Sequence, residues 1–423
     1  MAERSFLNDL LSRMALAGRR RRAKDGAAEE GVIALFDRLL GEEGEASGLV
    51  TAMQALERFE ASTAAEKLDV FAEVAGHYGV DDVDLAAAIR DWTAGDTEAA
   101  RRIHFAAEPK SQDLIRRLNQ VPGATARLVN MRADLLAATR DNPNLKGLDQ
   151  DFQHLFSSWF NRGFLEIRRI DWTTSAHILE KIIAYEAVHE ITGWDDLRQR
   201  VADPDRRLFA FFHPAMPSDP LIFVEVALLA DIPGAIGPII ASERDEIDPA
   251  EASVAVFYSI SNCQKGLRGV SFGNFLIKQV VTELQRELPG LQTFVTLSPV
   301  PGLRKWAEAG KDVILTDADR AAIAAEGGPT PEQTAALAAR YLTQARRTQG
   351  TAFDPVAHFH LGNGAELHKV HAGADLSENG QNNAWGVMVN YLYDGDRIET
   401  NHQAYATEQT IAASAGVKAL ATK

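Results

Sequence analysis

Apolar residues recur every three to four positions from Glu30 to about Arg162, in a stretch rich in alanine and charged side chains. The segments 84–92 and 131–139 show this spacing clearly, and runs of β-branched residues are almost missing here. A period of this kind places the apolar side chains on one face of each helix. We therefore predict an all-helical domain over residues 1–163, whose apolar faces form a bundle core.

The pattern changes near Phe164, where short β-branched and aromatic runs begin to alternate with helical segments. An amphipathic helix is predicted over 177–188, and strands over 208–212, 221–229, 253–260, 292–297 and 385–393. Continuously apolar strands with a long helix between two of them indicate a mixed sheet covered by helices. The fold class is therefore α+β. Residues 164–423 form the second domain, and the alanine-rich segment 316–348 is predicted to be a helical insertion in it.

Composition narrows the class of protein further. The chain has 423 residues, of which 46% are hydrophobic, and a formal net charge of −15. This balance argues against general nucleic-acid binding, which uses clustered Lys and Arg. The single cysteine, Cys263, excludes a disulfide framework and a thiolate zinc site, and it favours a reducing compartment. No run of about 18 apolar residues occurs, so we expect no membrane-spanning helix.

The first 24 residues differ from the rest because they carry a net charge of +5. Their apolar residues, Phe6, Leu7, Leu10, Leu11 and Met14, would share one face of a helix. That pattern is compatible with a targeting or membrane-surface helix. We expect an ordinary frayed N-terminal helix instead, because the apolar part is too short for a signal core and basic ends are commonly solvated.

A glycine-bearing loop follows the predicted strand 253–260 and precedes a helix that begins at about Asn274. Such a loop allows close backbone approach, and free N–H groups at the helix N-terminus attract a phosphate. The same order of elements also arises for packing reasons alone, so both explanations stay open. The spacing fits neither a P-loop nor a dinucleotide fingerprint.

In detail, residues 268–276 resemble the coenzyme A loop Arg-Gly-x-Gly-x-Gly/Ala-x-x-Leu of the GNAT acyltransferase superfamily, with Ser271 in place of the middle small residue. The residues that this resemblance assigns to coenzyme A binding are Gln264, Lys265, Gly266, Arg268, Gly269, Val270, Ser271, Gly273 and Asn274. The two cations and the helix N-terminus would supply local positive charge on an otherwise acidic chain.

Ser298 comes directly after the predicted strand 292–297 and is followed by Pro299 and Pro301. The prolines fix the backbone, so the serine hydroxyl is presented at a defined place. The alternative is that Ser298 only caps a helix that begins near Pro301. The surrounding sequence is not a Gly-x-Ser-x-Gly elbow, so an acyl-serine hydrolase is not indicated.

Four histidines, His358, His360, His368 and His371, fall within fourteen residues. Their spacing is compatible with metal ligation. Glu366 is the only carboxylate inside the cluster, so we expect one functional histidine among surface ones, and no metal site.

Together these motifs resemble the malonyl-CoA decarboxylase family, which has a helical N-terminal domain and a GNAT-type catalytic domain. The resemblance covers essentially the whole second domain, and the helical domain matches only in kind. The segments that carry it are 170–172, 180–183, 185–189, 217–221, 257–261, 264–270, 275–278, 297–302, 359–365 and 390–393.

The resemblance implies conversion of malonyl-CoA to acetyl-CoA and carbon dioxide without a metal or organic cofactor, in malonate or fatty acid metabolism. It assigns the catalytic pair to Ser298 and His360. Ser298 would orient the carboxylate or thioester without attacking it, and His360 would donate a proton or stabilise the enolate. Ser259 and Tyr393 are further candidates. If the histidines lie on a strand, His358 shares a face with His360 and is the alternative to it.

Two other classes of function stay open. An N-acyltransferase would use the same loop with an amine acceptor, although nothing in the sequence specifies one. A non-catalytic coenzyme A-binding scaffold would leave Ser298 and His360 without a role. The family's enzymes form tetramers, so the resemblance also implies a homo-oligomer assembled through the helical domain. We expect no nucleic acid or membrane as partner, and the bacterial cytoplasm as the compartment.

Overall fold

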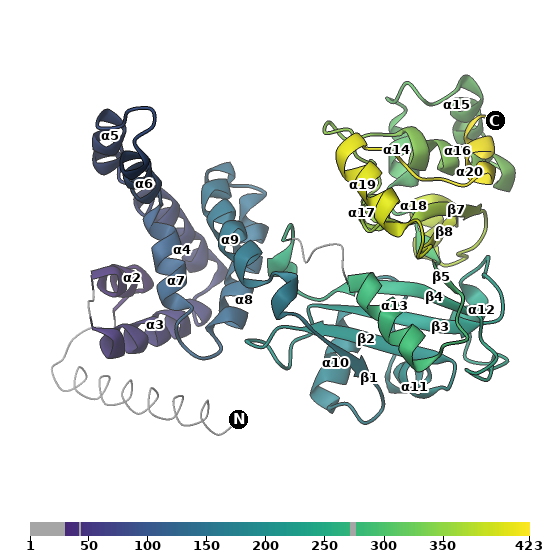
Figure 1. The fold of residues 1–423 in the computed structure, drawn as a ribbon, viewed down its shortest axis with the longest axis horizontal. Coiled ribbons are helices and arrows are strands. Elements are labelled where there is room, and N and C mark those ends of the chain that lie inside the picture. Colours follow the sequence, from purple (N-terminus) through teal and green to yellow (C-terminus); the bar gives the residue numbers. More distant parts are fainter. Residues whose placement is uncertain (1–29, 42–43, 271–275) are drawn as a thin grey trace. The chain divides into compact units, whose positions relative to one another are not determined.

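The structure is a computed structural model that describes residues 30–41, 44–270 and 276–423 (Figure 1). Its residues group into two units, which are described separately. The first holds Met1–Leu165, His213–Pro217 and Gln264–Phe272, and the second holds Glu166–Phe212, Ser218–Cys263 and Gly273–Lys423. The basic N-terminal segment and the candidate residues Ser271, Gly273 and Asn274 lie outside the described residues. Within the described ranges, no helix has the length and apolar character needed to cross a membrane.

The first unit is helical, as the 3.6-residue period predicts. Side-chain caps begin several of its helices; Thr63, for example, forms a capping box with Glu66. Its core contains the fully buried rings of Phe36, Phe59 and Phe156. The helices are α2 (Val32–Gly41), α3 (Glu45–Glu60), α4 (Ala64–His77), α5 (Asp82–Arg90), α6 (Thr97–Ala106), α7 (Lys110–Leu118), α8 (Ala124–Thr139) and α9 (Lys146–Trp159), with short 3-10 turns η1 (Pro143–Leu145), η2 (Arg162–Phe164) and η3 (Lys265–Leu267).

The second unit is built on an eight-stranded mixed sheet in the order β1-β2-β3-β4-β5-β8-β6, with β7 paired to β8. Strands β1 to β4 are antiparallel, and β4 and β5 are parallel. The strands are β1 (Glu166–Ile170), β2 (Arg206–Phe212), β3 (Ile222–Leu229), β4 (Val254–Asn262), β5 (Thr293–Thr296), β6 (Ser298–Pro299), β7 (Glu366–His371) and β8 (Met388–Leu392). The predicted α+β class, with a helical region followed by a mixed sheet covered by helices, is confirmed.

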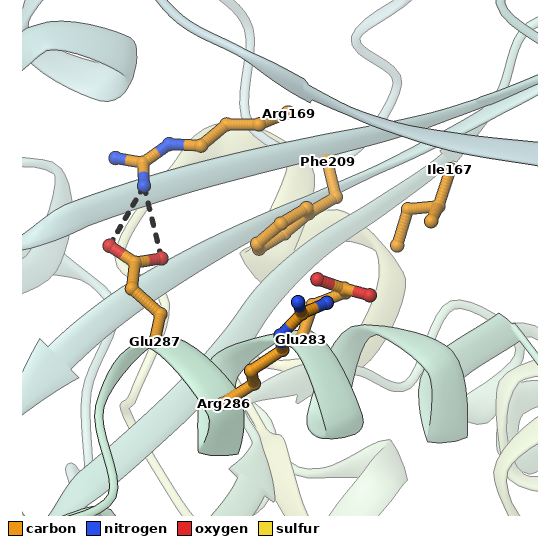
Figure 2. A pocket seen from close by; sticks show the side chains of 6 residues that line it. All are labelled: Ile167, Arg169, Phe209, Glu283, Arg286 and Glu287. Carbon is orange, nitrogen blue, oxygen red and sulfur yellow. Dashed lines mark hydrogen bonds and ion pairs between the residues drawn. The ribbon is translucent and has the colours of Figure 1, made fainter.

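Helices cover both faces of this sheet. Side chains of α10 (Ala176–Tyr185) and α11 (Trp194–Ala202) form one core with Leu208, Ala210 and Phe212 of β2. Phe209 points to the opposite face, where α13 (Leu276–Glu287) lies (Figure 2). This division follows from the alternation of side chains along a strand.

The remaining helices follow β5 along the chain (Figure 1). They are α14 (Leu303–Ala309), α15 (Asp317–Ala324), α16 (Pro331–Gln344), α17 (Pro355–Gly362), α18 (Glu378–Ala384), α19 (Ile398–Glu408) and α20 (Ala415–Ala421), and a short helix, α12 (Gly237–Ile240), precedes β4. The alanine-rich segment 316–348, which is predicted to be helical, contains the helices α15 and α16. Thr316 and Thr330 cap them with capping boxes.

The sequence reasoning missed the two-residue strand β6 and two longer strands. β1 has the sequence Glu-Ile-Arg-Arg-Ile, and it lies at the edge of the sheet, where charged residues are tolerated and no long apolar run is needed. β7 also mixes polar and apolar residues. Neither strand therefore shows the continuous apolar pattern that identified the central strands.

Candidate active site

Ser298 lies where the chain leaves β5 and enters the short strand β6. Pairing of Ser298 with Val389 of β8 holds it in the sheet, and only 5% of its surface is exposed. Its Oγ donates a hydrogen bond to Thr296 Oγ1 at 2.9 Å and lies 3.2 Å from His360 Nε2. The next helix, α14, begins after Gly302 and receives no side-chain cap. The alternative in which Ser298 only caps that helix is therefore wrong.

His360 is presented by the helix α17. Asp354 caps this helix by accepting hydrogen bonds from the N–H groups of Val356 and Ala357, each at 2.9 Å, and Pro355 occupies its first turn. The strand interpretation is therefore wrong for His358 and His360, whereas His368 and His371 do lie on a strand, β7. Residues two apart on a helix face different directions, so His358 does not share a face with His360.

Two tyrosines that follow in the chain fix the imidazole of His360. Its Nδ1 lies 2.8 Å from the hydroxyl of Tyr393, and its ring stacks on that of Tyr391 with centroids 4.5 Å apart. His360 and Tyr393 are buried, with 2% and 4% of their surfaces exposed. The structure thus brings three of the predicted site residues, Ser298, His360 and Tyr393, into one hydrogen-bonded chain.

This chain is electrically neutral. Burial lowers the pKa of His360 to about 3, and burial raises the pKa of the Tyr393 hydroxyl well above its usual value. Near neutral pH the imidazole therefore has one N–H donor and one nitrogen acceptor, with a hydroxyl group at each. In a dry, neutral site such hydrogen bonds are stronger than they are in water.

The other histidines of the cluster have separate partners. His358 Nδ1 lies 2.8 Å from Tyr405 OH, and His371 Nε2 lies 2.6 Å from Asn390 Oδ1. Among the residues that the structure describes, no group of three or more His, Cys, Asp or Glu side chains is placed to hold a metal ion.

Ser259 lies on β4, and its hydroxyl is directed to Glu186. The Oγ atom lies 2.8 and 2.9 Å from the two carboxylate oxygens, and Ser261 donates to the same carboxylate at 3.0 Å. Glu186 also accepts the N–H groups of Val188 and His189. The structure thus places Ser259 in a cluster around the half-buried Glu186, and its hydroxyl is bonded to Glu186 and Ser261 and not to Ser298.

The described part of the candidate coenzyme A loop, residues 264–270, packs on helices of the first unit. A Cβ atom on Gly266 would lie 1.8 Å from the carbonyl oxygen of Val129 in α8, so only glycine fits there. The buried Arg132 of α8 donates to the Gly266 carbonyl at 2.8 Å. Packing therefore explains Gly266, while Lys265 and Arg268 are exposed.

Gly269 and Val270 complete the described loop. Gly269 has a φ of 80°, a conformation that favours glycine, and its carbonyl accepts a hydrogen bond from Gln153 at 2.7 Å. Val270 is buried, and Gln264 is half-buried. Local backbone geometry therefore accounts for Gly269 without a ligand.

Two pockets in the second unit differ in their relation to these residues. One, of about 400 Å³, is lined by Tyr393 together with residues of α13, β5 and the start of α19. The other, of about 420 Å³, is lined by Ile167, Arg169, Phe209, Glu283, Arg286 and Glu287 (Figure 2). Arg169 and Glu287 form an ion pair there, and no predicted site residue lines it. The pocket at Tyr393 is the one that adjoins the hydrogen-bonded chain.

Sequence reasoning missed several residues that build the site. Thr296 is two residues before Ser298, and its acceptor role has no motif of its own. Tyr391 contributes a ring face, which only the fold brings to His360. Asp354 could have been found, because Asp followed by Pro is a helix-start signal.

The parallel β4–β5 pair within an otherwise antiparallel sheet, with the Ser298–His360 pair just beyond β5, defines an α+β protein that has a buried hydroxyl–imidazole site and a helical unit. The family model described as malonyl-CoA decarboxylase C-terminal domain matches residues 163–423, and the model described as malonyl-CoA decarboxylase N-terminal domain matches residues 78–160. The chain belongs to the malonyl-CoA decarboxylase family.

Individual relatives agree with this assignment. The crystal structure of malonyl-CoA decarboxylase from Rhodopseudomonas palustris is 49% identical, with a TM-score of 0.88 over 92% of this chain and 98% of that chain. The enzyme structure from Agrobacterium vitis is also 49% identical, with a TM-score of 0.86 over 93% of this chain and 100% of that chain. The mitochondrial malonyl-CoA decarboxylase of Rattus norvegicus is 34% identical over 84% of this chain and 82% of the rat protein.

Proposed function

We propose that this protein is a malonyl-CoA decarboxylase, a carboxy-lyase that converts malonyl-CoA to acetyl-CoA and carbon dioxide. The observation that carries the proposal is the buried Ser298–His360 contact of 3.2 Å, within the domain that matches the family. The reaction needs a group that stabilises the enolate oxygen and one that delivers a proton to C2. A neutral hydroxyl–imidazole pair supplies both kinds of donor.

In the proposed reaction, Ser298 binds the malonyl carboxylate or the thioester oxygen and does not attack it. The bond between C2 and the carboxylate breaks, carbon dioxide leaves, and the electron pair forms the enolate. His360 then donates a proton to C2 or stabilises the enolate oxygen. The surroundings of the buried imidazole hold little water. A charged carboxylate is less stable there than in water, and this favours its loss as carbon dioxide. No metal or organic cofactor enters this scheme.

We further propose that the loop 264–274 holds the phosphates of coenzyme A. The exposed cations Lys265 and Arg268 support this role, because they give positive charge to a loop that a buried arginine, Arg132, holds in place. Ser259 would act indirectly, by holding the Glu186 cluster beside the strand that precedes the loop.

The assembly and the compartment are also proposals. A homotetramer assembled through the helical unit is supported by apolar side chains on and beside α5 and α6 that are left exposed: Val83 at 78%, Ile89 at 54%, Trp92 at 47% and Phe105 at 69%. A reducing, cytoplasm-like compartment is supported by the single cysteine, Cys263, which is a buried free thiol. Malonate or fatty acid metabolism follows from the substrate.

The test is to incubate the purified protein with malonyl-CoA, without any amine, and to measure acetyl-CoA and carbon dioxide together. Equal amounts of both are expected. Transfer of the acyl group only when an amine is added would indicate an N-acyltransferase instead. Binding of coenzyme A with no product under either condition would indicate a scaffold.

Two variants test the catalytic pair. Ser298→Ala and His360→Asn should lower turnover by about 100-fold or more, since each removes a donor or acid at the reacting group, while coenzyme A binding stays unchanged. His358→Asn is the matched control, because this histidine contacts Tyr405, and it should keep the wild-type rate. Full activity of His360→Asn would contradict the assignment.

A further inference from the structure

A chain of four buried side chains runs through the candidate active site. Tyr393 OH lies 2.8 Å from His360 Nδ1, His360 Nε2 lies 3.2 Å from Ser298 Oγ, and Ser298 Oγ donates to Thr296 Oγ1 at 2.9 Å. Each of the four residues has at most 5% of its surface exposed. Protein groups therefore set the order of the protons along the chain.

The hydroxyl of Ser298 decides that order. A serine has one hydroxyl proton, and this proton is directed to Thr296. It is then not available for His360, so the Nε2 atom must donate in its contact with Ser298. A neutral imidazole has only one N–H, so Nδ1 must accept a hydrogen bond from the Tyr393 hydroxyl.

We infer that Thr296 is a positioning residue that fixes His360 as the Nε2–H tautomer, with every hydrogen bond of the chain donated in the direction from Tyr393 to Thr296. A second donor supports the accepting role of Thr296: the backbone N–H of Tyr391 donates to the same oxygen at 3.2 Å. The low pKa of about 3 that burial gives His360 fits the single N–H that this order requires.

The proton order has a chemical consequence that rests on the proposed function. In the opposite order Ser298 would donate to His360, which is the arrangement of a nucleophilic serine and its base. In the inferred order Nε2 carries the N–H, and His360 can give this proton to an enolate that takes the place of Ser298 Oγ as its acceptor.

The proton transfer balances with groups of the chain and water. After the C–C bond has broken, the Nε2 proton moves to C2 of the enolate and the Tyr393 proton moves to Nδ1, so the imidazole stays neutral and the negative charge passes from the enolate to the Tyr393 oxygen until the protons are restored. Nε2 then takes a proton from water, and Nδ1 returns its proton to Tyr393. One solvent proton is consumed for each acetyl-CoA formed.

The experiment is neutron diffraction from crystals soaked in D₂O, for the wild type, Thr296→Val and Thr296→Ser. We expect deuterium on Nε2 of His360 in the wild type and in Thr296→Ser, which keeps the accepting hydroxyl. In Thr296→Val the Ser298 hydroxyl loses its acceptor and turns to Nε2, so deuterium should appear on Nδ1.

Kinetics give a second readout. Thr296→Val should lower kcat for malonyl-CoA by about 100-fold, because the imidazole is then in the wrong tautomer, with little change in KM. Thr296→Ser should keep most of the wild-type rate, because it keeps the accepting hydroxyl. If Thr296 acted only through packing of its methyl group, Thr296→Ser would lose the rate instead.

Deuterium on Nδ1 in the wild type, or the same tautomer in all three proteins, would overturn the inference. These results need no turnover, so they are distinct from a failure of the proposed function. If the wild type carried deuterium on Nε2 but did not decarboxylate malonyl-CoA, the proton order would stand and the proposed function would fall.

Discussion

Asp354 is buried at the start of α17, and we expect its removal to impair both stability and the position of His360. Its carboxylate accepts the N–H groups of Val356 and Ala357 and a hydrogen bond of 3.3 Å from Tyr341. The helix has only eight residues. A short helix depends strongly on its cap, because few internal hydrogen bonds hold its first turn.

The magnitude follows from these contacts. Loss of an Asp cap costs about 1 kcal/mol. A buried Tyr341 hydroxyl without its acceptor costs about 1–3 kcal/mol more, and the lower end of this range applies because the hydrogen bond to Asp354 is long, at 3.3 Å. Burial raises the pKa of Asp354, so replacing it also relieves the cost of burying a charge. We expect Asp354→Ala to lower the free energy of unfolding by about 2 kcal/mol. A displacement of His360 by about 1 Å would lower kcat/KM about 100-fold.

The assay combines denaturant unfolding with malonyl-CoA turnover. Asp354→Asn keeps an accepting oxygen and should recover most of both losses. Thr63→Ala is the matched control, because it removes an exposed cap from α4 in the other unit and should lower stability without changing kcat. If Asp354→Ala kept the wild-type kcat/KM, the capped helix would not position His360 as we argue.

Three further predictions concern other residues. Below pH 6.5 an unfolded His360 binds a proton that the folded protein takes up only near pH 3. The free energy of unfolding should therefore fall by about 1.4 kcal/mol for each pH unit between these values as the pH is lowered. His360→Gln should remove this slope in acid titrations, and an unchanged slope would show that His360 is already protonated in the folded protein. Gly266→Ala should lower the free energy of unfolding in urea by about 1–3 kcal/mol, because the new Cβ meets the Val129 carbonyl. Gly147→Ala is the control and should not lower it, because no atom lies within 4 Å of the position of its Cβ. Equal effects of the two substitutions would reject the packing argument. Burial raises the pKa of Cys263, so a thiol reagent should label it only after unfolding, and rapid native labelling would show that it is accessible.

Local patterns were sufficient for much of the fold. The helical period up to Arg162 and the apolar runs of β2, β3 and β4 are properties of neighbouring residues, so they can be read without knowing the rest of the chain. Local pattern was not sufficient for the segment around His360, because alternating His and Phe fit a strand or a helix equally. The Asp354–Pro355 start signal would have decided for a helix.

The sequence by itself determined which residue types were available to the site, and motif order pointed to Ser298 and His360. Only the tertiary structure decided how they act, because Ser298 and His360 are 62 residues apart and Tyr393 is a further 33 residues along the chain. Pairing of β6 with β8 and the cap on α17 bring these groups to hydrogen-bonding distance. The direction of each hydrogen bond then depends on which acceptor lies nearby. The role of Thr296 as an acceptor therefore becomes visible only in the folded chain, where its hydroxyl lies next to that of Ser298.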